Sequence, residues 1–274
     1  MFTAATPSAS VSATVRVLPR VEPTTRPIRV EPVPAPRSRD AEEHVHAAQR
    51  IAQALKLIEE VAAPQRRLVH AGDRLYQAGE RFSHLHVLNS GLFKLVALSA
   101  DGREQVVDLK FRGDWLGFDG IAPGHYACDA VAMDTGEVWA VRYDLLLAAC
   151  ASHPALLAVL HDAMSRAIVR DRDCLMSVCT LGADARVADF LRWWAESLAG
   201  RGLRNDRITL RMTRAEIGNY LGLTLESVSR ALSRLARDKL IAFAGTGRRE
   251  VEIPDVGALA AFVQGSAAVQ APLQ

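Results

Sequence analysis

Between residues 65 and 145, short β-type runs alternate with turns that contain glycine. Gly72, Gly79, Gly91 and Gly102 stand about ten residues apart, and glycine adopts the positive φ angles of tight turns without a steric penalty. Many short strands at this spacing predict a small antiparallel roll or barrel. The expected strands lie in the runs RRLVH, RLYQ, HLHVLNS, LFKLVALS, EQVVDLKF, ACDAVAMD and EVWAVR.

The N-terminal segment has a different composition. Seven of the twelve prolines lie within residues 1–40. Proline lacks an amide donor and fixes φ, so this density opposes both helices and sheet ladders, and residues 1–40 are predicted to be a disordered tail. A helix is expected to begin near Asp40 and to run through AEEHVHAAQRIAQALKLIEEVA. The roll then belongs to a sensor-like domain of residues 41–150.

The sequence shows no membrane or export signal. No apolar run approaches the roughly 20 residues that cross a bilayer, and the N-terminus lacks a basic segment followed by an apolar one. The cysteines form no CxxC pair; they are Cys128, Cys150, Cys174 and Cys179. Scattered free thiols are typical of the reducing cytosol, so we expect a cytoplasmic protein with no membrane partner.

From Tyr143 onward the pattern becomes helical, and a long helical run extends from Pro154 to Gly182. Apolar residues recur at alternating steps of three and four over about four heptads, which is typical of a coiled-coil seam. A lone helix would leave this seam in water, so residues 151–182 are predicted to be the dimerisation helix of a homodimer. Packing of the helix against the chain's own roll is the alternative. The expected dimer contacts are Leu157, Leu160, Met164, Ile168, Asp171, Leu175 and Val178.

Residues 183–262 have the features of a winged helix-turn-helix. Thr213 and Glu216 have the spacing of a capping box, and Gly222 can take the left-handed conformation that ends a helix. Thr224 is a good N-cap for a second helix. The apolar arc of that second helix should face the first helix and consists of Leu225, Val228, Leu232 and Leu235.

The exposed side of the second helix carries Glu226, Ser229 and Arg230. Arginine can bond guanine O6 and N7 together, glutamate can accept from cytosine N4, and serine can bond a base edge or a phosphate. Because a glutamate beside phosphates would be repelled, this face favours reading of a specific C·G pair. The alternative is a solvated helix face with an internal Glu226–Arg230 pair. Further contacts with double-stranded DNA are expected at Thr224, Ser227 and Arg214.

Charge placement supports this interpretation. The whole chain has a net charge of only +2, but residues 183–253 contain 13 arginine or lysine and 9 aspartate or glutamate residues. Two short strands around a GTG turn are expected to form a wing, where Arg248 could hold a phosphate. Residues 263–274 are predicted to be a flexible C-terminal tail.

The order of roll, long helix and winged helix-turn-helix resembles the CRP/FNR family of bacterial transcription regulators, and most of all its FNR-like branch. The resemblance covers roughly residues 55–262. Three stretches carry it: GDWLGFDGIAPGH from Gly113, MTRAEIGNYLGL from Met212, and LTLESVSRALSRL from Leu223. It implies an α+β fold in which a cyclic-nucleotide-binding-like β-roll precedes the dimerisation helix.

The resemblance also implies a function. A two-fold dimer would read an inverted repeat of the type TTGAT-N4-ATCAA and act as an activator with RNA polymerase as partner. The loops at residues 117–126 and 199–207 are candidate polymerase contacts. The half-site would be read by Glu226, Ser229 and Arg230.

Two departures from the family pattern bear on cofactors. Members of the FNR branch hold a 4Fe–4S cluster through N-terminal cysteines and one roll cysteine, whereas this chain has no cysteine before Cys128 and has Trp139 at the roll position. A cluster needs four converging thiolates. The CRP branch binds cyclic AMP through Gly-Glu-Leu and a following Arg-Ser pair, but the stretch GDWLGFDGIAPGHYACDAVA offers no arginine to hold the phosphate. We therefore expect a cluster-free, FixK-like protein that needs no cofactor and no cyclic AMP.

Several alternatives for the signal stay open. The protein could be active whenever it is made, with Asp171 facing its own copy across the dimer axis and weakening association. It could respond to thiol redox at Cys174 or Cys179, or to a small ligand. Haem ligation would require His84, His86 or His125, for which surface histidines are the ordinary interpretation.

Two other classes of function are alternatives. A ligand-binding regulatory module that does not bind DNA would have the same roll, but it would not need a complete helix-turn-helix. An enzyme is not expected, because the sequence contains no G-x-S-x-G, HExxH, P-loop or GxGxxG motif.

Overall fold

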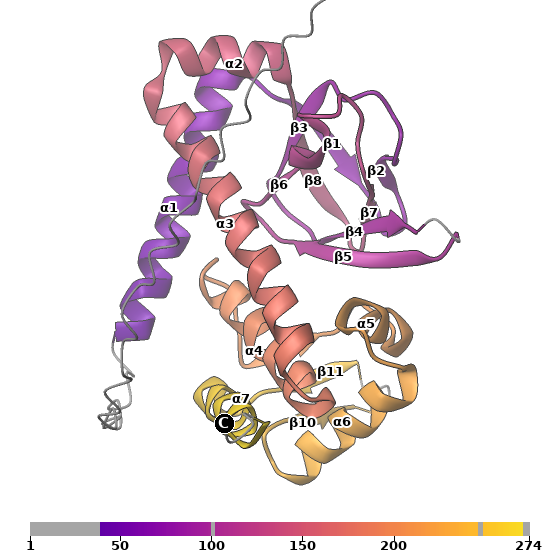
Figure 1. The fold of residues 1–274 in the computed structure, drawn as a ribbon. Coiled ribbons are helices and arrows are strands. Elements are labelled where there is room, and N and C mark those ends of the chain that lie inside the picture. Colours follow the sequence, from indigo (N-terminus) through magenta and orange to yellow (C-terminus); the bar gives the residue numbers. More distant parts are fainter. Residues whose placement is uncertain (1–38, 100–101, 246–248, 271–274) are drawn as a thin grey trace, which may run out of the picture. The chain divides into compact units, whose positions relative to one another are not determined.

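A computed structural model of the chain describes residues 39–99, 102–245 and 249–270 (Figure 1). All of them belong to one compact unit, Arg37–Gln274. The predicted disordered tail lies almost wholly outside the described residues. The first helix, α1 (Arg39–Ala62), confirms the helix expected from Asp40. None of the helices in the described ranges combines the length and apolarity that a bilayer crossing requires.

Two four-stranded antiparallel sheets form the predicted β-roll, with strand orders β1-β8-β3-β6 and β2-β7-β4-β5. Each of the seven expected runs contains a strand, and only β6, which has two residues, was not foreseen. The strands are β1 (Gln65–Val69), β2 (Arg74–Tyr76), β3 (His84–Leu88), β4 (Phe93–Leu98), β5 (Glu104–Lys110), β6 (Trp115–Leu116), β7 (Asp129–Ala132) and β8 (Gly136–Arg142).

The turn after β3 shows why the spaced glycines matter. Gly91 has a φ of 93°, which favours a residue without a side chain. A Cβ atom there would also lie 3.0 Å from the Cα atom of Gly136 at the start of β8. The two backbones can therefore approach, and β3 pairs with β8 from His84↔Arg142 to Leu88↔Val138.

Two helices follow the roll. The short α2 (Tyr143–Ser152) begins at Tyr143, where the sequence pattern is expected to turn helical. The long α3 (Pro154–Thr180) has proline at its start and ends before Gly182, as the helix signals predict. Figure 1 shows α1 beside the first half of α3, and the two helices share a buried cluster with Leu55, Leu156 and Leu160 among its members.

The predicted dimer seam on α3 divides into two parts. Leu160 is only 5% exposed and packs in the chain's own core, so this residue follows the alternative of packing against its own roll and neighbouring helices. Exposed apolar side chains dominate the rest, with Ile168 at 48% and Leu175 at 63%. Leu157 is marginally exposed, Asp171 is exposed, and Met164 and Val178 are half-buried.

The C-terminal module contains the predicted helix-turn-helix and wing. Its sheet has three strands, in the order β10-β11-β9, rather than the two expected. The elements are α4 (Ala183–Ala199), β9 (Arg207–Thr209), α5 (Arg214–Leu221), α6 (Leu225–Arg237), β10 (Ala242–Ala244), β11 (Glu250–Glu252) and α7 (Val256–Gln270).

The C-terminus differs from the prediction of a flexible tail over residues 263–274, because α7 extends to Gln270. Its alanine-rich sequence has a high helix propensity. Phe262 and Val263 also pack against the buried cluster of the module, which anchors the helix past the expected boundary.

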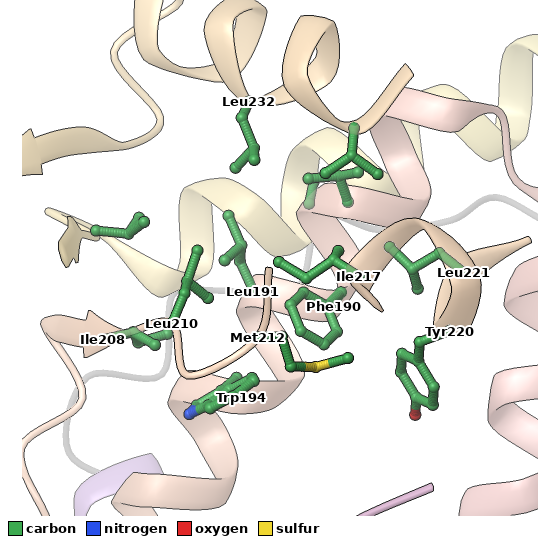
Figure 2. Close-up of a cluster of buried hydrophobic side chains, with 14 of the residues drawn as sticks. Phe190, Leu191, Trp194, Ile208, Leu210, Met212, Ile217, Tyr220, Leu221 and Leu232 are labelled. Carbon is green, nitrogen blue, oxygen red and sulfur yellow. The ribbon is translucent and has the colours of Figure 1, made fainter. Parts of the chain in front are cut away.

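One cluster of buried side chains extends from the roll into this module. Val96, Val106 and Phe111 join it from the β4–β5 region of the roll. Figure 2 shows the part formed by the module, where α4 packs against the strand β9 and helices α5 and α6. The labelled side chains are Phe190, Leu191, Trp194, Ile208, Leu210, Met212, Ile217, Tyr220, Leu221 and Leu232.

Candidate nucleic-acid interface

The first helix of the helix-turn-helix, α5, begins with the predicted capping box. The Thr213 hydroxyl accepts a hydrogen bond from the Glu216 amide at 3.1 Å, and the Glu216 carboxylate accepts from the Thr213 amide at 2.7 Å. The same carboxylate is 2.5 Å from the Lys94 ammonium of β4. Burial alone would raise the pKa of Glu216, but the hydrogen bonds from Lys94 and Thr213 outweigh burial and lower that pKa. The helix start is therefore fixed both locally and against the roll.

The turn between the two helices requires two glycines. Gly222 has φ 65° and ψ 38°, the left-handed conformation predicted for it. Gly218 was not singled out from the sequence, yet a Cβ atom there would lie 2.6 Å from the carbonyl oxygen of Leu223. The Leu223 amide donates to the Gly218 carbonyl at 2.8 Å. This close approach sets the position at which the second helix begins.

The second helix, α6, begins at its predicted N-cap. The Thr224 hydroxyl accepts from the Ser227 amide at 3.2 Å. Val228, Leu232 and Leu235 are buried as expected, but Leu225 is 46% exposed, so its predicted place in the buried arc is wrong. The buried Ala231 explains the difference, because at about 100° per residue it shifts the centre of the arc away from Leu225.

The opposite side of α6 carries the predicted reading face. Glu226 and Arg230 are exposed and Ser229 is half-buried. In the part of the chain that the structure describes, neither Glu226 nor Arg230 lies in an ion pair, which disfavours the alternative of an internal salt bridge. The pKa of Glu226 is lowered first by its own backbone amide, then by Thr224, and only weakly by Arg230. The face therefore keeps both its charges available.

The helix that bears this face is tied to the rest of the module. The Arg234 guanidinium donates to the Asp184 carboxylate of α4 at 2.6 Å, and Asp184 raises the pKa of Arg234. Ser233 and Arg237 are exposed and lie on the same side of the helical wheel as Glu226. They were not among the predicted DNA contacts, although the same periodicity places them there.

The remaining predicted DNA contacts have different surroundings. Ser227 is half-buried and bonds the N-cap Thr224. Arg214 is the first residue of α5, and its guanidinium lies 5.8 Å from the ring of Phe243 in β10. Arg248 lies outside the described residues.

The two thiols considered for redox sensing both lie on α3. Cys174 is half-buried against the module core, and Cys179 is exposed. Five positions on a helix are separated by about 140° around its axis, so the two thiols of one chain point apart and cannot form a disulfide with each other.

The interior of the roll is filled by its own side chains. The rings of Tyr76 and Tyr126 stack with centroids 3.9 Å apart, and His86 is 5.6 Å from Tyr76. Burial, with smaller contributions from His84 and Arg67, lowers the pKa of His86 to about 3. Trp139, at the position compared with a cluster ligand, is 3% exposed and donates to Glu137. Within the described ranges no three His, Cys, Asp or Glu side chains are arranged to hold a metal ion.

Comparisons with known proteins agree with this architecture. The model of the Crp-like helix-turn-helix domain matches residues 185–262, and that of the cyclic nucleotide-binding domain matches residues 66–153. The chain is 32% identical over 194 residues to the fumarate and nitrate reduction regulatory protein of Salmonella typhimurium, covering 71% of this chain and 76% of that protein.

Solved structures share the fold. FixK2 from Bradyrhizobium japonicum superposes with a TM-score of 0.64 at 25% identity, covering 72% of this chain and 96% of that one. A CRP-family transcriptional regulator from Thermus thermophilus superposes with a TM-score of 0.58 at 23% identity, covering 73% and 98%.

Proposed function

Because the chain belongs to the CRP/FNR family of DNA-binding transcription regulators, we propose that it binds an inverted repeat of the TTGAT-N4-ATCAA type as a homodimer, with RNA polymerase as its second partner. The observation that carries this proposal is the exposed face of α6. Glu226, Ser229 and Arg230 stand together there, on a helix whose other side is buried in the module core.

The chemistry of this face suits the major groove. The Arg230 guanidinium can donate two parallel hydrogen bonds to guanine O6 and N7, and the Glu226 carboxylate can accept from the N4 amine of the paired cytosine. Ser229, at the edge of the face, can bond a base or a neighbouring phosphate. Arg214 at the start of α5 and Arg248 in the wing would neutralise phosphates and position the helix.

The dimer proposal rests on the exposed part of α3. An inverted repeat is read by a protein with two-fold symmetry, whose reading helices enter the groove about one turn of DNA apart. Ile168 and Leu175 leave large apolar surfaces in water in the single chain, and an identical helix would cover them. Asp171 lies between them, and partial desolvation and the charge of Asp108 already raise its pKa within one chain.

The residues do not fit the cofactors that other members of the family use. A 4Fe–4S cluster has no cysteine set in this chain, since none precedes Cys128 and Trp139 replaces the roll ligand. A cyclic nucleotide would need space where Tyr76, His86 and Tyr126 pack together. We therefore propose that DNA binding requires neither group.

The test is fluorescence anisotropy of the aerobically purified full chain on a TTGAT-N4-ATCAA duplex and on a scrambled duplex, each with and without dithiothreitol. We expect tight binding to the repeat that does not depend on reductant. Binding only in dithiothreitol would favour the thiol alternative, for which the exposed Cys179 is the candidate. Equal weak binding to both duplexes would contradict sequence-specific recognition and favour a module that does not bind DNA.

A variant pair sharpens the assay. Arg230→Ala should weaken binding to the repeat by about 1–3 kcal/mol and leave binding to the scrambled duplex nearly unchanged, because only a base contact is lost. Lys56→Ala removes a cation that is exposed on α1 and should change neither affinity. An equal loss on both duplexes for Arg230→Ala would contradict base reading by this residue.

A further inference from the structure

A hollow of about 800 Å³ lies outside the roll, between α1, α3, the β5–β6 region and the end of α4. Its volume is within the range of about 300–1,000 Å³ that small-molecule sites occupy. Its lining contains none of the side chains that fill the roll interior. It is therefore a different place from the interior of the nucleotide-binding-like roll.

The hollow is also separate from the proposed dimer seam. On α3 it is lined by Asp162, Arg166 and Arg170, whereas the seam uses Met164 and Ile168. Residues that are two positions apart in an α-helix point in directions about 200° apart around its axis. Arg166 is two positions from both Met164 and Ile168, so it lies on the opposite side of α3 from these seam residues. A partner helix on the seam would leave the hollow accessible.

Cations outnumber carboxylates around the hollow by one. It is lined by five cationic side chains and four carboxylates, and three of the cations have carboxylate partners. Lys110 is 2.6 Å from Asp108, Arg201 is 2.8 Å from Asp114, and Arg166 pairs with Asp162.

Two of the five cations are left without a carboxylate. Arg50 of α1 forms no ion pair within the described ranges. Arg170 uses its guanidinium on aromatic rings, lying 3.5 Å over Trp193 and bonding the Tyr220 hydroxyl.

Arg50, Arg166 and Arg201 line the same hollow. Burial lowers the pKa of Arg166, and the nearby charges of Arg201 and Arg50 lower it further, while Asp114 partly compensates. Arg166 is half-exposed, and its carboxylate partner Asp162 is exposed as well. Guanidinium groups that line one hollow, and of which one has no carboxylate partner, can bind an anion that accepts forked hydrogen bonds.

The walls beside this cluster are apolar. Ile51, Ala54 and Leu57 of α1 face the hollow from one side, and Ala158 and Val159 of α3 from the other. We propose that the hollow binds a small organic anion, with its carboxylate or phosphate between Arg50 and Arg166 and its apolar body between α1 and α3.

The location suggests a consequence for regulation. Arg170 lines the hollow and also bonds Tyr220 of α5, the first helix of the helix-turn-helix. A bound anion beside Arg170 would compete for its guanidinium and so influence the placement of α5. This consequence rests on the proposed DNA-binding function, whereas binding of the anion itself does not.

The experiment is isothermal titration calorimetry of the full chain with 1-naphthyl phosphate, with 1-naphthol and inorganic phosphate as the uncharged and the purely ionic controls. We expect saturable binding of 1-naphthyl phosphate, with each control at least tenfold weaker. Arg50→Gln and Arg166→Gln should each weaken binding about tenfold, because each removes charged hydrogen bonds. Lys56→Gln, on α1 but outside the hollow, should have no effect.

A space-filling variant tests the location. Ala158 is exposed and lines the hollow, so Ala158→Trp should abolish binding while the chain stays folded by circular dichroism. Equal effects of Lys56→Gln and Arg50→Gln, or equal binding of 1-naphthol and 1-naphthyl phosphate, would overturn the proposal. The absence of any saturable binding would also overturn it, and dissociation of a dimer by Ala158→Trp would then identify a second copy as the occupant of the hollow.

Anisotropy on the TTGAT-N4-ATCAA duplex, with and without saturating 1-naphthyl phosphate, separates the two proposals. Loss of anion binding with intact DNA binding would contradict only the anion site. Anion binding without specific DNA binding would contradict only the DNA proposal. We expect the bound anion to change the DNA affinity severalfold, and no change would overturn the regulatory consequence.

Discussion

The roll interior and the exposed face of α6 use polar side chains in opposite ways. In the roll, Tyr126 stacks on Tyr76 and donates to the His84 carbonyl at 2.8 Å, so its polar atom is satisfied within the chain. On α6, Glu226 and Arg230 lie in solvent without an ion pair among the described residues. The first arrangement stabilises a fold, and the second leaves hydrogen-bonding capacity for a partner. Substitutions in the two regions should therefore have separable effects.

The largest effect is expected in the roll. Tyr126→Ala removes a buried ring from the aromatic stack and should lower the free energy of unfolding by about 3–5 kcal/mol. Urea denaturation measures this loss, and Tyr126→Phe is the matched control that loses only one hydrogen bond, about 1 kcal/mol. The ratio of affinities for the repeat and the scrambled duplex should not change. A fall in that ratio would contradict the expectation that substitutions in the two regions have separable effects.

An intermediate effect is expected from acid. The pKa of His86 is about 3 in the folded chain and about 6.5 when unfolded, so the unfolded chain binds the extra proton between these values. The contribution of the neutral His86 to the stability of the folded chain is present in full above pH 6.5 and is lost as the pH falls. Between pH 7 and pH 5 the free energy of unfolding should drop by about 2 kcal/mol from this group. His86→Leu should remove that part of the slope in urea titrations, and an unchanged slope would contradict burial of the neutral ring.

The smallest effect is expected at the boundary of the reading face. Thr224→Ala removes the N-cap of α6 and should lower the free energy of unfolding by about 1 kcal/mol. It should also weaken binding to the repeat, because the cap holds the first turn that carries Glu226. Thr224→Ser keeps the capping oxygen and should restore both properties in thermal melts and anisotropy. A variant that changes neither would show that the cap does not position the face.

Local features were predictable from the sequence. The capping box at Thr213, the left-handed Gly222 and the N-cap Thr224 each depend on a few neighbouring residues, so their patterns were sufficient. The position of Leu225 was predicted wrongly because a helical wheel does not show which neighbouring residue extends a short apolar arc. In the structure the buried Ala231 extends the arc on the side away from Leu225. The strand β6 has only two residues, which is too short for a periodic pattern, and it depends on the roll around it.

Contacts between distant segments were not predictable. Whether Leu160 faces a partner or its own core depends on α1, which packs against α3 from more than a hundred residues earlier in the chain. The hollow is a similar case, since Arg50, Lys110, Arg166 and Arg201 belong to four separate segments. The ion pair of Lys94 with Glu216 likewise joins the roll to α5 without any local signal.

The continuous core between the β4–β5 region and the helices of the C-terminal module has a thermodynamic consequence. Val106 and Phe111 share one buried cluster with Leu191 and Leu232, so neither region can melt without exposing apolar surface of the other. Calorimetry should then record a single cooperative transition for both. Because the two regions would unfold together, binding of DNA by α6 would also stabilise β4 and β5. Amide protons of these strands would therefore exchange with solvent more slowly in the complex.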